Sequence, residues 1–165
     1  MPSRTDPPRA AGDKGSAGTT NDLPVFTIPP LPRKEHACGV MATVSVLIVD
    51  DQVPFRDVAR MVVDMTEGFE VVGEAAGGTS GVAEASRLRP DLVLMDMNMP
   101  DIDGFEATRR IRAELPQTRV LMLSTHDPAD YRTQALEAGA FDFMTKSEFD
   151  PFILADGWAG AVSEA

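Results

Sequence analysis

The sequence predicts an α/β protein in which helices cover both faces of a five-stranded parallel β-sheet. Four short apolar runs have the length and composition of buried strands, at residues 44–49, 92–95, 120–123 and 141–145. Stretches with helical periodicity separate the strands, and such alternation is typical of parallel sheets. A polar or charged side chain directly follows each of the four runs. In chain order these are the Asp50–Asp51 pair, Asp96, Ser124 and Lys146.

The first half of this pattern predicts two strands and two helices. The first strand covers residues 44–49, and a helix over 54–65 begins at Pro54, a residue that suits a first helical turn. The second strand covers 69–73, and Gly77–Gly78 opens a loop before a weakly patterned helix that ends near residue 89. The stripe of the first helix is more typical of a core than of a cofactor site, and it consists of Phe55, Val58, Ala59 and Val62.

The second half predicts three more strand–helix units. The third strand covers 92–96, and Asp103 caps a helix that begins at Gly104, with Glu106 completing a capping box. The inner face of that helix is expected to contain Phe105, Thr108, Ile111 and Leu115. The remaining elements are a strand over 119–124, a helix over 129–138 that Gly139 ends, a strand over 141–145, and a helix from 148 or 150 to 163.

The last helix has two unusual features. Gly157 and Gly160 weaken it, each by up to about 1 kcal/mol relative to alanine. Trp158 either faces the core or anchors a partner, and the sequence favours neither alternative.

The polar groups that end the strands indicate a site. The carboxyl ends of parallel strands share one edge of a sheet, where open α/β sheets place their ligands. Asp96 alone is explained equally well as a strand-ending or capping residue. The convergence of acids, a hydroxyl and a lysine at one edge favours a functional site over a set of ordinary strand-ending residues. Lys146 is the only lysine after Lys34, so an ordinary surface lysine is a less plausible explanation for it.

Composition narrows the functional classes. The chain has 165 residues, 43% of them hydrophobic, which suffices for one domain with a core. A net charge of −11 argues against a nucleic-acid interface, which needs a basic face. Cys38 is the only cysteine, so neither a disulfide framework nor a thiolate metal cluster is expected. Without a stretch suited to a membrane helix or signal peptide, a soluble cytoplasmic protein is expected.

The amino-terminal part of the chain differs from the rest. Seven of the 13 prolines fall in residues 1–40, and Gly, Ser and Thr fill much of 12–20. This composition predicts a disordered tail over residues 1–42, more plausibly passive than a docking segment and dispensable for the chemistry. The folded domain is expected over 43–165.

The combination and order of these groups resemble the receiver domain of two-component response regulators. The resemblance covers roughly residues 44–162, with every element in register, and extends to receivers of helix-turn-helix output regulators and to single-domain, chemotaxis-type regulators. It implies the flavodoxin-like, doubly wound strand order 2-1-3-4-5, which places Asp50, Asp51 and Asp96 close together. Ser147 departs from the family pattern, because many receivers have a cis proline after the lysine.

The resemblance also implies roles for individual residues. Asp96 is the phosphoacceptor, Asp51 binds Mg²⁺ directly, Asp50 binds it mainly through water, and the Asn98 carbonyl is a further ligand. Lys146 and Ser124 contact phosphoryl oxygens. Asn98 and His126 border the path of a hydrolysing water and tune the phosphoryl lifetime, although a lone loop histidine is more often simply solvated.

The resemblance implies that the protein is a signalling module switched by phosphorylation. It would catalyse only its own phosphorylation and dephosphorylation and would not be an enzyme for other substrates. A histidine kinase or phosphotransfer protein supplies the phosphoryl group, and Ser124 and Phe143 relay the change to a surface of helix 4, strand 5 and helix 5. That surface docks a downstream partner or a second copy. Phe143 is alternatively a fixed core residue.

Three alternatives remain open at this stage. The chain is either a single-domain regulator or a truncated receiver of a DNA-binding regulator. A phosphorylation-independent binding module fits less well, because the set of acids, Ser124 and Lys146 is complete. A phosphatase of the haloacid-dehalogenase type also fits less well, because Asp50 and Asp51 are adjacent rather than two residues apart, and neither nucleotide-binding glycine motif is present.

Overall fold

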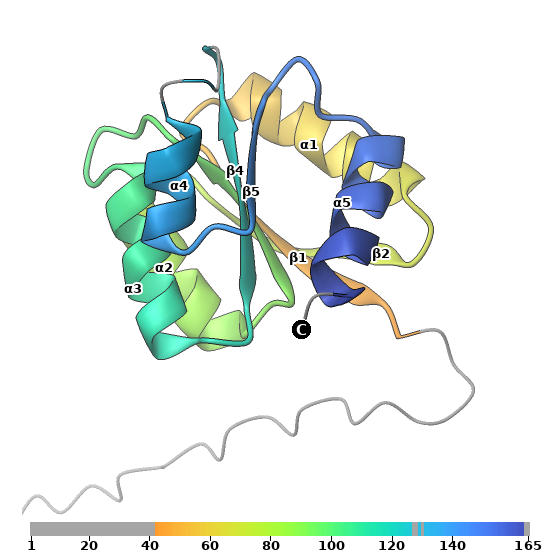
Figure 1. Ribbon diagram of the computed structural model, residues 1–165, viewed down its shortest axis with the longest axis horizontal. Coiled ribbons are helices and arrows are strands. Elements are labelled where there is room, and N and C mark those ends of the chain that lie inside the picture. Colours follow the sequence, from red (N-terminus) through yellow and green to blue (C-terminus); the bar gives the residue numbers. More distant parts are fainter. Residues whose placement is uncertain (1–41, 127–128, 130, 164–165) are drawn as a thin grey trace, which may run out of the picture. The chain divides into compact units, whose positions relative to one another are not determined.

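The computed structural model describes residues 42–126, 129 and 131–163, so the tail expected over 1–42 lies outside the described residues except for Ala42. Five parallel strands form one sheet in the order β2-β1-β3-β4-β5, which confirms the predicted doubly wound fold (Figure 1). The strands are β1 (Val44–Val49), β2 (Phe69–Ala75), β3 (Leu92–Asp96), β4 (Arg119–Ser124) and β5 (Asp142–Thr145).

Helices cover both faces of this sheet. They are α1 (Val53–Met65), α2 (Gly78–Leu88), α3 (Gly104–Glu114), α4 (Arg132–Ala138) and α5 (Pro151–Ser163). Figure 1 shows α1 and α5 on one face and α2, α3 and α4 on the other. None of the described helices is long and apolar enough to cross a membrane.

The two central strands supply side chains to both layers of the core. Alternate residues of a strand point to opposite faces of the sheet. On β1, Val46 and Ile48 pack with residues of α1 and α5, whereas Leu47 and Val49 pack with residues of α2 and α3. All four are at most 1% exposed, so the continuous apolar run reflects burial on both faces.

The predicted inner face of α1 was wrong at one position. Val58 is 48% exposed, and the buried residues of this helix are Ala59, Val62 and Val63. The apolar residues of α1 occupy two stripes, and only the one that includes Ala59 faces the sheet. Val58 belongs to the other stripe, which also holds the exposed Met61 and Met65.

Most element boundaries fell within three residues of their predicted positions. Strand β2 extends two residues beyond Gly73, because β1 continues beside it as far as the pair Val49 and Ala75. Helix α4 begins at Arg132 rather than at residue 129, and α2 ends in a left-handed Arg89 with φ of 48°. Among the described residues no peptide bond is cis, and this includes the bond between Lys146 and Ser147.

The predicted Asp103 cap of α3 is confirmed, but Glu106 does not complete a capping box. The Asp103 side chain accepts a hydrogen bond from the backbone N–H of Glu106, at 2.8 Å. The Glu106 carboxylate accepts hydrogen bonds from Arg110 and Arg109, at 2.8 and 3.4 Å. On α5, Trp158 packs edge-on against Phe69, with 6.2 Å between ring centroids, as a half-buried residue beside the core.

Candidate functional site

The site lies where β1 and β3 end side by side. Asp50 and Asp51 follow β1, and Asp96 is the last residue of β3. Each of the three carboxylates offers one oxygen, and these oxygens lie within 4.8 Å of one another. Asp50 and Asp96 are 1% and 4% exposed, whereas Asp51 is exposed to solvent. The predicted meeting of three acids is therefore confirmed.

Lys146 reaches into this cluster from the end of β5. Its Nζ lies 2.5 Å from Asp50 Oδ2 and 3.0 Å from Asp96 Oδ1, and 4.4 Å from the centroid of the Phe55 ring. The side chain of Lys146 is only 10% exposed. A single ammonium thus bridges the two buried carboxylates, and it leaves the cluster with more negative than positive charge.

Burial and charge change the acidity of both partners. Burial raises the pKa of Asp96 to about 6; the hydrogen bond and charge of Lys146 oppose this rise, and the charges of Asp50 and Asp51 add to it. Burial alone would lower the pKa of Lys146, but its hydrogen bonds to Asp50 and Asp96, together with their charges, raise it above the ordinary value. Lys146 therefore stays charged, while ionising Asp96 is costly in the absence of a further cation.

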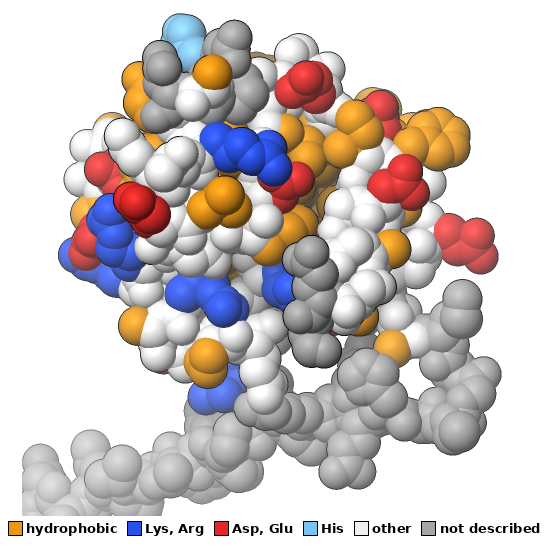
Figure 2. Space-filling view, viewed as in Figure 1, with side chains coloured by type: hydrophobic (Ala, Val, Ile, Leu, Met, Phe, Trp, Pro, Cys, Tyr) orange, Lys and Arg blue, Asp and Glu red, His pale blue; other side chains and the backbone are white. Residues whose placement is uncertain are grey.

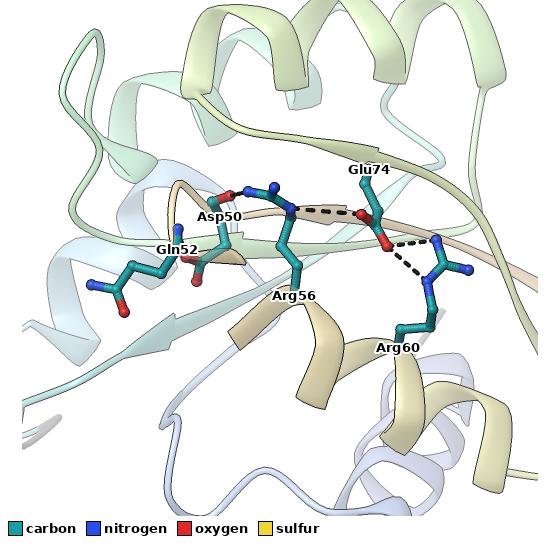
Figure 3. Close-up of polar contacts among 5 residues, drawn as sticks. All are labelled: Asp50, Gln52, Arg56, Arg60 and Glu74. Atoms are coloured by element: carbon teal, nitrogen blue, oxygen red, sulfur yellow. Dashed lines mark hydrogen bonds and ion pairs between the residues drawn. The ribbon is translucent and has the colours of Figure 1, made fainter. Parts of the chain in front are cut away.

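The loop after β1 is fixed by contacts that the sequence did not reveal. The Arg56 guanidinium donates to the backbone carbonyl of Asp50 at 2.6 Å and pairs with Glu74 at 3.6 Å (Figure 3). Arg60 pairs with the same Glu74, and the backbone N–H of Gln52 donates to Asp50 Oδ1 at 2.8 Å. The Arg56 side chain is only 15% exposed. Its hydrogen bond to the Asp50 carbonyl fixes the backbone that carries Asp50 and Asp51.

The end of β4 brings Ser124 to the same edge of the sheet. Ser124 is fully buried, and its hydroxyl oxygen accepts the backbone N–H of His126 at 3.1 Å. The backbone N–H of Lys146 donates to the Ser124 carbonyl at 2.7 Å, which joins the ends of β4 and β5. Asn98 and His126 are both exposed in the loops that follow β3 and β4.

Two further residues shape the surroundings of Asp96. A Cβ atom on Gly104 would lie 2.3 Å from the Asp96 carbonyl oxygen, so only glycine permits α3 to start this close to β3. Phe143 on β5 is 1% exposed and belongs to the core, and Arg132 donates to its backbone carbonyl at 3.3 Å. The structure thus places Phe143 inside the domain.

Comparisons with known proteins agree with this geometry. A family model described as the response regulator receiver domain matches residues 46–155. The transcriptional regulatory protein DegU of Brevibacillus brevis is 37% identical over 103 residues, which cover 62% of this chain and 44% of DegU. The chain therefore spans less than half of the length of that relative.

Solved structures with the same fold are similar over most of the chain. A LuxR-family two-component response regulator from Aurantimonas sp. SI85-9A1 has a TM-score of 0.68 and 31% identity, covering 74% of this chain and 87% of that one. The CheX–CheY–BeF3–Mg complex from Borrelia burgdorferi has a TM-score of 0.67 and 26% identity, covering 73% and 90%. Because the family model matches most of this chain, we conclude that the protein belongs to the response regulator receiver domain family.

Proposed function

We propose that this receiver domain accepts a phosphoryl group on Asp96, with Mg²⁺, from a histidine kinase or phosphotransfer protein. The observation that carries the proposal is the cluster of three carboxylate oxygens within 4.8 Å, bridged by Lys146. A phosphorylation-independent binding module would have no use for buried acids that repel one another. The domain catalyses only its own phosphorylation and dephosphorylation.

The residues present fit a magnesium ion. Mg²⁺ prefers hard oxygen ligands and keeps several waters, and the cluster offers carboxylates with an excess of negative charge. Asp51 and Asp96 would hold the ion directly, Asp50 mainly through water, and the Asn98 carbonyl would be a further ligand. When bound, Mg²⁺ supplies positive charge that neutralises Asp96 and the oxygens of the incoming phosphoryl group.

The protein's own residues then account for the transfer. An ionised Asp96 oxygen attacks the phosphorus in line; a P–O bond forms as the P–N bond to the donor histidine breaks. Lys146, which in this structure is shared between Asp50 and Asp96, would turn to a phosphoryl oxygen, and the Ser124 hydroxyl would donate a hydrogen bond to another. Asn98 and His126 stand in exposed loops, from which they adjust the access of a hydrolysing water.

The signal would leave through α4, β5 and α5. Movement of Ser124 toward the phosphoryl group frees space that Phe143 occupies, and phosphorylation biases an equilibrium between two packings. Phe143 is 1% exposed in this structure, so a change in its packing would be transmitted through the core. The proposed surface exposes Leu136 on α4 and Phe152 on α5, at 45% and 81%.

The exposed apolar side chains extend beyond that surface. Met61 and Met65 on α1 are 61% and 70% exposed, and Met65 lines a pocket together with Phe152 of α5. Figure 2 shows hydrophobic side chains grouped on the upper right of this face, where Figure 1 places α1 and α5. A downstream protein or a second copy of the chain would dock on the α4–β5–α5 surface.

Beryllofluoride, a mimic of the phosphoryl group, tests this function. With Mg²⁺ it should bind at Asp96 and shift the backbone NMR resonances of Ser124, Phe143 and α4. A spectrum that does not respond would favour the binding module. Changes that stay beside Asp96 would refute the relay through Phe143 alone.

The similarity to DegU favours a second, compatible function, in which this receiver serves a transcriptional regulator. In either case we expect action in the cytoplasm, with residues 43–165 as the receiver and no direct contact between this acidic domain and nucleic acid. A chain that starts at Met41 should accept the phosphoryl group as the full chain does.

A further inference from the structure

The amino terminus of α2 is capped by a residue that lies far away in the sequence. Gly77 precedes the helix and has no side chain to cap it. Instead, the two carboxylate oxygens of Asp101 accept the backbone N–H groups of Gly78 and Thr79, at 2.9 and 2.7 Å. Asp101 belongs to the loop between β3 and α3, and both of its oxygens are engaged although the residue is exposed.

Close backbone contact accompanies these hydrogen bonds. A Cβ atom on Gly78 would lie 2.7 Å from the carbonyl oxygen of Ile102, so glycine is required where α2 meets the loop. In the sequence, Gly77 and Gly78 indicated only a loop, and this close contact gives the structural reason for the glycine at position 78. The start of α2 and the β3–α3 loop therefore form one packed unit.

The same loop carries a proposed ligand of the metal ion. Its two ends are joined by a hydrogen bond from the Gly104 N–H to the Met97 carbonyl, at 2.9 Å. Between these ends, Asn98 and Asp101 are three residues apart, and Asp101 attaches the middle of the loop to α2. Asn98 is exposed, so packing against the core does not fix it. The position of its backbone carbonyl therefore depends on how the loop is held.

We infer that Asp101 is a positioning residue, which fastens the β3–α3 loop to α2 so that the Asn98 carbonyl is held ready for the cation. This inference rests on the proposed function. Hydrogen bonds, led by the one from the Thr79 backbone N–H, hold the pKa of Asp101 far below its usual range, so the contact is charge-assisted at neutral pH.

Thermodynamic linkage requires that cation binding and the attachment of the loop to α2 strengthen each other. If the attachment of the loop to α2 favours cation binding, then the cation must strengthen that attachment by the same free energy. Addition of Mg²⁺ should therefore slow hydrogen exchange of the Gly78 and Thr79 amides. This effect is independent of phosphorylation.

The test compares Asp101→Ala with Asp101→Asn. Both remove the same charge, but asparagine keeps a carbonyl oxygen that can accept one of the two N–H groups. Mg²⁺ affinity is measured by an NMR titration that follows the backbone amide resonances around Asp96, and amide exchange is measured by NMR as well. Asp101→Ala should weaken Mg²⁺ binding about tenfold, the lower end of what outer contacts of metal ligands contribute, and Asp101→Asn should weaken it less.

Asp150 provides the matched control. It also caps a helix by accepting two backbone N–H groups, from Phe152 and Ile153, but it does so locally on α5. Asp150→Ala should lower stability and leave Mg²⁺ affinity close to that of the wild type. If Asp101→Ala does not fold, Thr79→Pro removes one donor from the helix side, in a first turn that tolerates proline, and it should also weaken Mg²⁺ binding.

Two results would overturn the inference while leaving the proposed function intact. One is wild-type Mg²⁺ affinity in Asp101→Ala; the other is an equal loss in Asp101→Ala and Asp101→Asn, which would assign the effect to charge. If the wild type itself does not bind Mg²⁺, or Asp51→Ala binds it equally well, the metal site of the proposed function is wrong and the inference falls with it.

Discussion

Replacing Asp96 by asparagine should stabilise the metal-free protein at neutral pH. Asp96 is 4% exposed and lies among other acids, so its charge is unfavourable in the folded state. Asparagine has nearly the same shape and remains neutral. The variant would then lose the phosphoacceptor and gain folding stability. Such a trade-off is expected where a functional site contains charges that repel one another in the folded state.

The magnitude follows from the pKa of Asp96. A rise from 3.8 to about 6 corresponds to about 3 kcal/mol of unfavourable free energy in the ionised folded state, at 1.36 kcal/mol per unit. Because the folded state binds the proton more tightly than the unfolded state, this contribution to stability falls as the pH rises from about 4 to about 6. The stability difference between Asp96→Asn and wild type should grow through that window and then level off.

Urea unfolding with a metal chelator, at several pH values, measures this difference. The comparison with wild type cancels the other carboxylates that titrate at acidic pH, among them Glu84, Glu106 and Glu148. The control is Asp64→Asn, at an exposed position on α1, which should change little. A variant no more stable than wild type at neutral pH, or a difference that does not vary with pH, would refute the electrostatic reasoning.

Four further substitutions, of which Arg60→Met serves as the control for Arg56→Met, are tested by urea unfolding. Thr108→Val should add about 1 kcal/mol, because Thr108 Oγ1 is the only buried side-chain polar atom without a partner in the part of the chain described; a clear loss would contradict this. Gly160→Ala should add up to about 1 kcal/mol, since nothing lies within 4 Å of an added Cβ; a loss would mean that the site is not open. Arg56→Met should cost about 1–3 kcal/mol, because the buried Asp50 carbonyl loses its donor, whereas Arg60→Met should cost under about 1 kcal/mol; equal effects would assign the role to Glu74 pairing alone.

The strands were predictable because burial on both faces leaves a plain signal. The run of β3 is wholly apolar until Asp96, and no competing helical pattern occurs there. The end of β2 was less predictable, because its last two residues are ordered by pairing with β1 rather than by their own composition. The face of α1 was misjudged at Val58, because two apolar stripes run along one helix and only packing distinguishes them.

The residues at the strand ends were predictable as a cluster, because parallel strands end at one edge of the sheet. The contacts that hold the loops were not. Arg56 pairs with Glu74 across 18 positions of sequence, and Asp101 caps α2 across 23. No local periodicity marks such a pair, since each residue taken alone resembles an ordinary surface charge.

The most direct test of the account is where a phosphoryl group attaches. The protein is incubated with a small phosphodonor and Mg²⁺, and intact-mass and peptide mass spectrometry then locate the modification. We expect one phosphoryl group on Asp96, labile to hydroxylamine, absent without Mg²⁺ and absent from Asp96→Asn. Undiminished phosphorylation of Asp96→Asn, or a stable phosphoryl group on another residue of the wild type, would contradict the assignment of Asp96 as the phosphoacceptor.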